Sequence, residues 1–581
     1  MANERDVSAA RRRAAAELTR GISGTVVFLF IMSGLISLLA LTGALYMMQV
    51  YDRALTSGSV PTLAALSALA LGLYLFQGAF DAIRSQVLVR IGARLDRKLG
   101  PIAHKVAIEM PRFGFSTTES LERGRDVDTV RGFLAGQGPA ALFDLPWIPV
   151  FLAFVYILHP WLGVLTLTGA FVLAVLTIAS EFLTRRHAAG TRAAAIARNA
   201  IADSNARNAD VIRAMGFSGH AVARFKAAND EHLTLQTRTS DIAGTLSALS
   251  RVLRMLLQSG VLGLGAFLVI KGELTAGAIM AATVASGRAL APVDQAIANW
   301  KSFVAARASF ARLRETIGAL ATAVQPMDLP RARRFLSVSN VTVAAPASGQ
   351  VILTDMTLEL RAGEALGIIG PSGGGKSTLV RALVNVWPTL RGSIRLDGAE
   401  LGHWNEDALG RNIGYLPQDV ALLDATVEEN IARLDPSPDP DKVIAAATAA
   451  GIHELILKLP QGYRTPIGPQ GSVLSAGQRQ RVGLARALYG DPFLVVMDEP
   501  NSNLDTTGEA ALKDAILAVK ARGGIAIVVA HRPSALAAVD HIAVIQNGRL
   551  AAMGPRDEIL SHGSGSSVHP LPDKLSRRKV S

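Results

Sequence analysis

The stretch GPSGGGKST, residues 370–378, says more about the fold than any other part of this chain. It follows the short apolar run EALGIIG and leads into a helix-like pattern that starts at Lys376. A strand, a Gly-x-x-x-x-Gly-Lys-Ser loop and a helix in this order predict a loop that binds phosphate. We expect the amides of residues 373–377 to surround the phosphates at the helix N-terminus, where the helix dipole favours anions.

The whole loop is assigned to nucleotide binding. Its candidate residues are Gly370, Pro371, Ser372, Gly373, Gly374, Gly375, Lys376, Ser377 and Thr378. Lys376 is expected to bridge the β- and γ-phosphates of ATP, and the Ser377 hydroxyl is expected to ligate Mg²⁺.

A second candidate group follows the apolar run FLVVMDEP, residues 493–500. This run predicts a buried strand that ends in two acids. Asp498 is expected to hold the magnesium, directly or through water, and Glu499 to polarise the attacking water. Paired acids at a strand end can also cap a helix, but the apolar strand and its position downstream of the loop favour catalysis.

The composition indicates a membrane protein. Of 581 residues, 50% are hydrophobic and only 18% are charged, and the mean hydropathy is +0.31. So little charge is rare in a soluble protein of this length. The chain has no cysteine, which excludes disulfides, thiolate metal sites and a cysteine-protease domain.

Uncharged runs in the first half predict six membrane spans. They cover Gly21–Tyr51, Ala54–Phe80, Leu145–Ser180, Met255–Ile270 and Leu274–Gly287, and the third is expected to break at HPWLG, residues 159–163. A spanning helix needs about 20 apolar residues, so the last two runs need flanking residues to reach that length. Buried helices of a soluble protein are the alternative, but they seldom run this long without charge.

Basic residues predict the orientation of these spans. RSQVLVRIGARLDRK, residues 84–98, follows the second span, and TRRHAAGTRAAAIARNA, residues 184–200, follows the fourth. The positive-inside rule places both loops and the basic N-terminus in the cytoplasm. This placement accounts for much of the net charge of +12, so no nucleic-acid partner is expected. Asp144 is expected to be a helix-end acid at the membrane interface.

The predicted fold is an α-helical, six-span transmembrane domain fused to an α/β P-loop nucleotide-binding domain. We expect a basic cytoplasmic N-terminus at residues 1–20, a membrane domain at 21–320 and a linker at 321–334. The nucleotide-binding domain is expected at 335–562, followed by a disordered tail at 563–581.

The stretch VLSAGQRQRVGLARAL, residues 473–488, resembles the signature of the ABC transporter family. In that family Ser475 and the Gly477 amide would contact the γ-phosphate of an ATP bound by a second subunit, which implies a head-to-tail homodimer. Gln478 is assigned to nucleotide binding with them. Gln418, in GYLPQD, matches the glutamine that senses magnesium and contacts the membrane domain. SNLD, residues 502–505, matches the loop joining the two sites, and His531 matches the switch histidine at the γ-phosphate.

Two positions depart from the family pattern. Ala345 stands where the family usually has an aromatic residue that stacks on adenine, so adenine packing must come from elsewhere or be weak. Pro469 stands where many exporters have glutamate, which affects the expected coupling of this loop to the membrane helices.

Longer stretches narrow the resemblance to the PrtD-like branch of bacterial type I secretion ABC transporters. They lie at residues 44–59, 141–163 and 488–505, and the likeness extends from about Gly21 to Leu560. It implies an inner-membrane exporter with its nucleotide-binding domain in the cytoplasm, a periplasmic membrane-fusion adaptor and an outer-membrane channel. It also implies cargo proteins with an uncleaved C-terminal secretion signal, and no leader-peptide processing, since little chain precedes the first span.

Two alternatives stay open at this point. A lipid or drug exporter shares the architecture, and only the branch-specific stretches favour protein cargo. A soluble ABC-type ATPase acting on DNA would share the signature and the basic charge, but the predicted spans argue against it.

Overall fold

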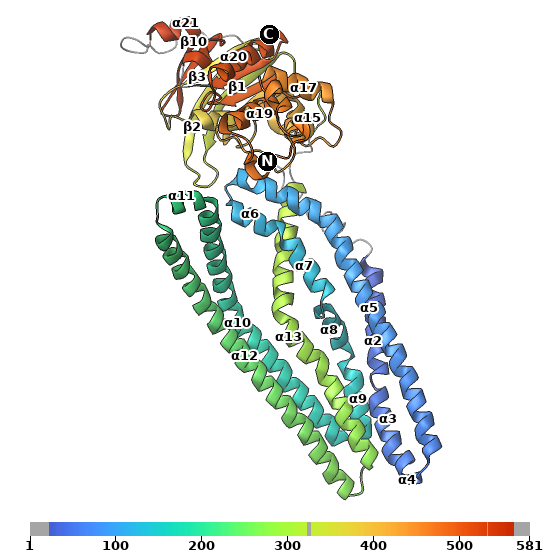
Figure 1. Cartoon of the computed structure of the whole chain (residues 1–581). Helices are drawn as coiled ribbons and strands as arrows, with labels where there is room; N and C mark the ends of the chain where they lie inside the picture. Colours follow the sequence, from blue (N-terminus) through green and yellow to red (C-terminus); the bar gives the residue numbers. More distant parts are fainter. Residues whose placement is uncertain (1–21, 322–326, 531–532, 563–581) are drawn as a thin grey trace, which may run out of the picture. The chain divides into compact units, whose positions relative to one another are not determined.

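The computed structural model describes residues 22–321, 327–530 and 533–562 (Figure 1). Contacts divide the chain into two compact units: Met1–Glu109 with Ser116–Thr322, and Met110–Phe115 with Ala323–Ser581. The predicted N-terminal segment, residues 322–326 of the predicted linker and the predicted tail lie outside the described residues. The six residues Met110–Phe115 group with the second unit, although they fall within the predicted membrane domain. The other domain limits stay predictions.

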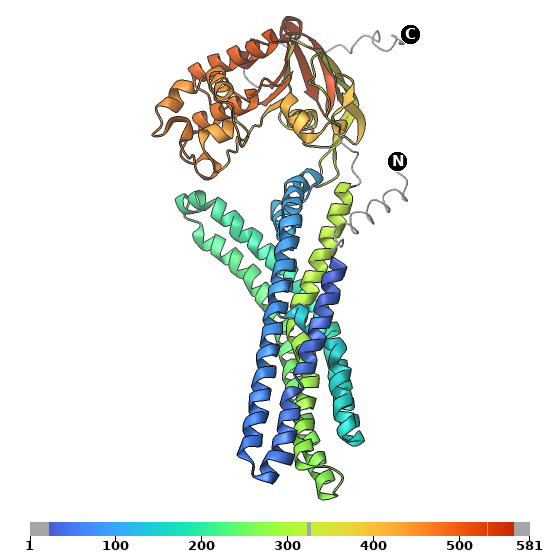
Figure 2. The ribbon, with the colours of Figure 1, turned by 90° about the vertical axis from the view of Figure 1, so that its right-hand side faces the viewer.

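The first unit is helical, and Figure 2 shows its long helices running alongside one another. Among its described residues, the helices are α2 (Ile22–Leu39), α3 (Thr42–Gln49), α4 (Leu55–Ser57), α5 (Val60–Glu109), α6 (Thr117–Gly124), α7 (Asp126–Ala135), α8 (Gly138–Asp144), α9 (Ile148–Leu158), α10 (Pro160–Arg207), α11 (Ala209–Ala214), α12 (Ser218–Ile270) and α13 (Ala276–Ala321). The predicted break at residues 159–163 occurs at His159, which is extended between α9 and α10. The His159 Nδ1 atom accepts a hydrogen bond from the Trp161 amide, so this histidine caps the N-terminus of α10.

Within the described residues, five helical segments are long and apolar enough to cross a membrane. They are Gly24–Ser57, Val60–Phe113, Gly138–Leu158, Ser218–Ile270 and Ala276–Glu315. A shorter apolar segment, Pro160–Leu176, begins α10 and corresponds to the fourth predicted span. The 50 residues of α5 make a helix about 75 Å long, whereas the hydrocarbon core of a bilayer is about 30 Å thick. Helices of this length therefore extend well beyond the bilayer.

A buried ion pair joins three helices of this unit. Arg84 on α5 donates to the Asp144 carboxylate at the end of α8 at 2.6 Å and to the Ser33 hydroxyl on α2 at 3.1 Å. Only 8% of the Arg84 side chain is exposed. Asp144 does end a helix, as the sequence indicates, but its pairing with Arg84 was not predicted. A buried pair of this kind costs several kcal/mol when one partner alone is removed.

The second unit contains two sheets. The larger has the strand order β10-β9-β3-β8-β7-β6, and the smaller, antiparallel one has the order β2-β1-β4-β5. The strands are β1 (Phe335–Ala344), β2 (Val351–Arg361), β3 (Ala365–Ile369), β4 (Arg391–Leu396), β5 (Ala399–Glu400), β6 (Ile413–Leu416), β7 (Leu494–Asp498), β8 (Ile525–Val529), β9 (His541–Gln546) and β10 (Arg549–Pro555). All neighbours in the larger sheet are parallel except β9 and β10. Every residue of β7 and β8 is buried, as expected where helices cover both faces of a parallel sheet.

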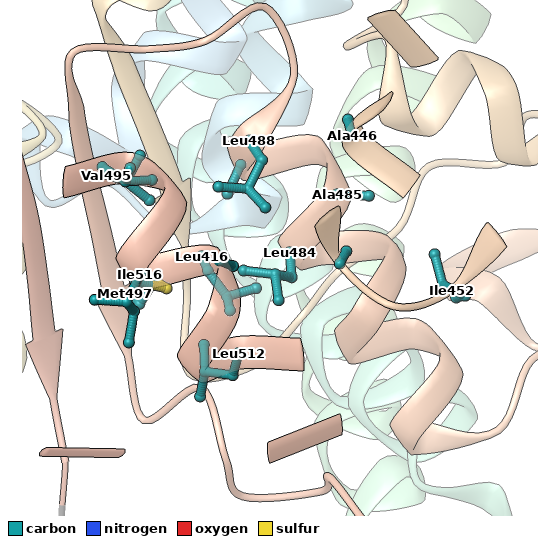
Figure 3. Packing of buried hydrophobic residues seen from close by; sticks show 14 of the residues in the cluster. Leu416, Ala446, Ile452, Leu484, Ala485, Leu488, Val495, Met497, Leu512 and Ile516 are labelled. Carbon is teal, nitrogen blue, oxygen red and sulfur yellow. The ribbon is translucent and has the colours of Figure 1, made fainter. Parts of the chain in front are cut away.

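Helices pack on the larger sheet and fix the ends of its strands. They are α14 (Lys376–Leu383), α15 (Glu406–Asn412), α16 (Val427–Ile431), α17 (Pro440–Ala449), α18 (His453–Leu457), α19 (Ala476–Leu488), α20 (Thr506–Ala521) and α21 (Arg556–His562). Figure 3 shows part of the core, in which Leu416 and Met497 of the sheet lie among Leu484, Leu512 and Ile516 of α19 and α20. This packing holds the carboxyl ends of β3, β6 and β7 together, where the candidate site lies.

Candidate nucleotide-binding and hydrolysis site

The Gly-rich loop connects β3 to α14, as the sequence predicts. Gly375 has φ +102°, and a Cβ atom there would lie 2.6 Å from the Leu353 side chain, so only glycine fits. Among the residues that the structure describes, no side chain caps α14, and the first turn of this helix carries no acid. The amides at this helix N-terminus are therefore free of a competing side-chain acceptor, which suits an anion.

The Lys376 ammonium is held inside the loop. The residue is buried, and its Nζ donates to the carbonyl oxygens of Gly370 and Pro371, each at 2.9 Å. An ammonium has three protons, so one remains for a further acceptor. The charge is thus fixed within the loop that would surround a phosphate.

Asp498 ends β7 and is only 2% exposed. Burial raises the pKa of its carboxyl, and the Glu499 charge raises it further, while a hydrogen bond from Ser377 and the charges of Arg381 and Lys376 oppose these effects. Among the described residues, its Oδ1 atom has no hydrogen-bond partner. A buried carboxylate oxygen without a partner, beside a serine hydroxyl, fits a Mg²⁺ ligand set, because magnesium prefers oxygen ligands. The residues present therefore suit the predicted metal.

Glu499 follows directly and adopts an unusual backbone conformation. Its φ is +51°, and its amide donates to the Val529 carbonyl at 3.0 Å. A left-handed conformation is uncommon for a non-glycine residue and is often found at functional sites. The Gln418 side-chain amide, just after β6, donates to Glu499 Oε2 at 3.3 Å. The structure thus brings together Gln418 and Glu499, which are 81 residues apart in the chain.

The signature stretch forms the N-terminus of α19. The Ser475 hydroxyl accepts from the Gln478 amide at 3.3 Å, and the Gln478 side chain accepts from the Ser475 amide at 2.9 Å. This reciprocal pair is a capping box. A Cβ atom at Gly477 would lie 2.9 Å from the Asn503 carbonyl oxygen, so the helix start approaches the SNLD segment closely.

Gln480 is a structural contact that the sequence did not suggest. It is buried, its side chain accepts from the Asn503 amide at 3.0 Å and it donates to the Pro500 carbonyl. It therefore ties α19 to the segment that follows the two acids. Its place inside the signature, five residues after Ser475, was the only signal in the sequence.

Other expected features have different outcomes. His531 lies outside the described residues, so its place in the site stays a prediction. Ala345 begins the turn between β1 and β2, and Pro469 begins a short 3-10 turn ahead of the signature.

Comparison with known proteins identifies both halves of the chain. Residues 25–290 match the ABC transporter transmembrane region, and residues 353–502 match the ATPase domain of ABC transporters. The type I secretion system ATP-binding protein PrsD of Rhizobium meliloti (strain 1021) is 49% identical over 528 residues, which cover 91% of each chain. The leukotoxin translocation ATP-binding protein LktB of Mannheimia haemolytica is 30% identical over 560 residues, covering 93% of this chain and 77% of that one.

A solved structure shares the whole architecture. The structure of a bacterial Atm1-family ABC exporter with ATP bound superimposes with a TM-score of 0.77 at 25% identity, covering 94% of this chain and 97% of that one. The predicted fold class, an exporter-type helical membrane domain fused to an ABC nucleotide-binding domain, is confirmed. The chain is a multi-pass membrane protein that binds nucleotide and couples ATP hydrolysis to transport, and it belongs to the ABC transporters, among the type I secretion ATP-binding proteins.

Proposed function

We propose that this chain is the inner-membrane component of a type I secretion system, and that it exports proteins carrying a C-terminal secretion signal. The 49% identity to PrsD over nearly the whole length carries this proposal. Protein cargo is also named for LktB, the leukotoxin translocation protein, which is a more distant relative. The partners of such an exporter are a membrane-fusion adaptor and an outer-membrane channel.

The site geometry supports the following division of labour in hydrolysis. Lys376, held by two loop carbonyls, turns its remaining proton toward the β- and γ-phosphates. Asp498 and Ser377 hold Mg²⁺, which supplies charge neutralisation on the phosphates when bound. Glu499 polarises the attacking water and accepts its proton, while Gln418 orients the Glu499 carboxylate through their hydrogen bond. Gln418 would also contribute an oxygen ligand to the metal.

The remaining site residues act across a homodimer in this proposal. Ser475, Gly477 and Gln478 present the N-terminus of α19 to an ATP bound by the partner subunit, and His531 contacts the γ-phosphate. Both nucleotide-binding domains then lie in the cytoplasm, and the basic loops after the second and fourth predicted spans support this orientation. ATP binding draws the two domains together, and hydrolysis releases them, which is a ligand-driven shift between two states.

A lipid or drug exporter is the second candidate. The solved Atm1-family exporter shares this fold over 94% of the chain, so the architecture by itself does not select the cargo. One fold can serve many functions, so the cargo is determined by the residues that contact it and not by the shared architecture.

The test compares the proteins outside the cell with and without this gene. We expect specific extracellular proteins to vanish on deletion, to return with the wild-type gene and to stay inside with Lys376→Ala. Lys513→Ala is the matched control, since Lys513 is exposed on α20 and is not among the candidate nucleotide-binding residues. A peptide from the C-terminus of a vanished protein should change the ATPase rate of the purified transporter. Normal secretion by Lys376→Ala, or a response to lipids and drugs but to no protein C-terminus, would overturn the proposal.

A further inference from the structure

The proposed ATP site lacks an aromatic ring at the position where the family usually has one. Ala345 follows β1, and its amide donates to the Gln350 carbonyl at 2.8 Å, which closes the turn before β2. The turn lies close to the phosphate loop, because Leu353 on β2 pairs with Val343 on β1 and touches Gly375. A nucleotide whose phosphates are held at that loop can place its base near this turn, but the methyl group of Ala345 offers it no aromatic face.

The segment Met110–Phe115, which belongs to the second unit, reaches the same turn. Gly114 has φ +90°, and a Cβ atom there would lie 2.3 Å from the carbonyl oxygen of Pro346, the residue next to Ala345. The approach is so close that only glycine fits. Gly114 is flanked by two phenylalanines, so this contact brings aromatic rings to the turn where the family residue is missing.

The backbone of the segment distinguishes the two rings. The Gly114 amide donates to the Pro111 carbonyl at 3.1 Å, and the Phe115 amide donates to the Met110 carbonyl at 3.4 Å. These are the two hydrogen bonds of a Schellman motif, in which the residue after the glycine characteristically packs on the residue at the start of the turn. We therefore expect the Phe115 ring to pack on the side chain of Met110, which is buried.

The Phe113 ring takes no part in the packing expected of this motif, so it can contact the base of a nucleotide. It is 57% exposed. The neighbouring Arg112 donates to the Asn385 side chain at 2.8 Å, just after α14, and its guanidinium lies 6.0 Å from the centre of the Phe113 ring. The segment that carries the ring is therefore held at two points of the same unit, through Arg112 at Asn385 and through Gly114 at Pro346.

We propose that Phe113 stacks on the adenine of ATP and replaces the aromatic residue absent at Ala345. This proposal rests on the proposed nucleotide site but not on the cargo. Every base presents a π-face, and stacking on an aromatic side chain contributes measurably to nucleotide affinity. In this proposal Phe113 binds the base and raises nucleotide affinity, and it is supplied by a segment far from the phosphate loop in the sequence.

The test measures equilibrium binding of Mg²⁺ and the non-hydrolysable adenylyl imidodiphosphate to the purified full-length transporter. Phe113→Leu keeps an apolar side chain but removes the ring, and it should weaken binding about five- to tenfold. Phe113→Tyr should bind like the wild type. Phe115→Leu is the matched control and should change affinity less than about twofold, since its ring packs on Met110 in this scheme.

Two further measurements separate stacking from a general disturbance. Inorganic triphosphate has no base, so Phe113→Leu should leave its affinity unchanged. Ala345→Tyr in the Phe113→Leu background should restore nucleotide affinity, and it should add much less in the wild type. Unchanged nucleotide binding by Phe113→Leu, or an equal loss for inorganic triphosphate, would disprove stacking. If the wild type binds no nucleotide, the proposed nucleotide site is wrong. If the wild type binds nucleotide but exports no protein, only the proposed cargo is wrong.

Discussion

Replacement of Glu499 by glutamine should separate ATP binding from ATP hydrolysis. Glutamine has nearly the same shape, and its side-chain oxygen can still accept the hydrogen bond that Gln418 donates at 3.3 Å. The fold and the phosphate loop should therefore be unaffected. The amide, however, cannot accept a proton from water, and a lost general base typically costs a factor of 10² or more in rate. A hundredfold loss corresponds to about 2.7 kcal/mol of activation free energy.

Phosphate release from the purified transporter with saturating Mg²⁺ and ATP measures this effect. Nucleotide binding is measured in parallel, and the variant should bind at least as tightly as the wild type and accumulate as an ATP-bound dimer. Glu454→Gln, an exposed acid at the start of α18, serves as the control and should hydrolyse normally. Near-normal turnover by Glu499→Gln would remove Glu499 from the catalytic role, and a joint loss of binding and turnover would assign it a structural role instead.

Three further substitutions test other parts of the structure. Asp498→Asn should abolish Mg²⁺-dependent hydrolysis yet raise the unfolding temperature of the nucleotide-free protein, measured in thermal scans with chelator at pH 7. Burial raises the pKa of the Asp498 carboxyl, so folding penalises its charged form at pH values above that pKa, and the neutral amide removes the penalty. A lower unfolding temperature would contradict this. Arg84→Leu should destabilise the membrane unit by about 3–5 kcal/mol, because it leaves the Asp144 carboxylate buried without its ion-pair partner. Adding Asp144→Leu should recover most of this loss. An unchanged denaturation midpoint in the Arg84→Leu variant would show that the ion pair contributes little to stability. Gln480→Ala should slow hydrolysis with little change in ATP affinity, since it frees the Asn503 amide from α19, and wild-type turnover would make this contact dispensable.

The parts that were predictable from the sequence are those in which neighbouring residues carry the signal. The strand, loop and helix around Lys376 follow one another directly, and the acids at Asp498 and Glu499 end an uninterrupted apolar strand. The break at His159 was visible for the same reason, because a proline follows it inside an otherwise apolar run.

Features that depend on contacts between distant residues were not predictable. Arg84 and Asp144 are 60 residues apart, and the sequence around either residue does not identify its ion-pair partner. Arg112 and Asn385 are 273 residues apart, so nothing local marks Met110–Phe115 as part of the second unit. Packing over the whole fold determines which residues of two distant segments come into contact. Periodicity in the sequence predicts only the secondary structure of the segment in which it occurs.

The great length of α5 has a mechanical consequence. A helix is a stiff rod, and the 50 residues from Val60 to Glu109 make one about 75 Å long. If such a rod pivots at one end by about 10°, its other end sweeps through about 13 Å. A small tilt of the membrane-spanning part of α5 is thus magnified along the helix into a displacement wider than an aromatic ring at Glu109, where the helix ends.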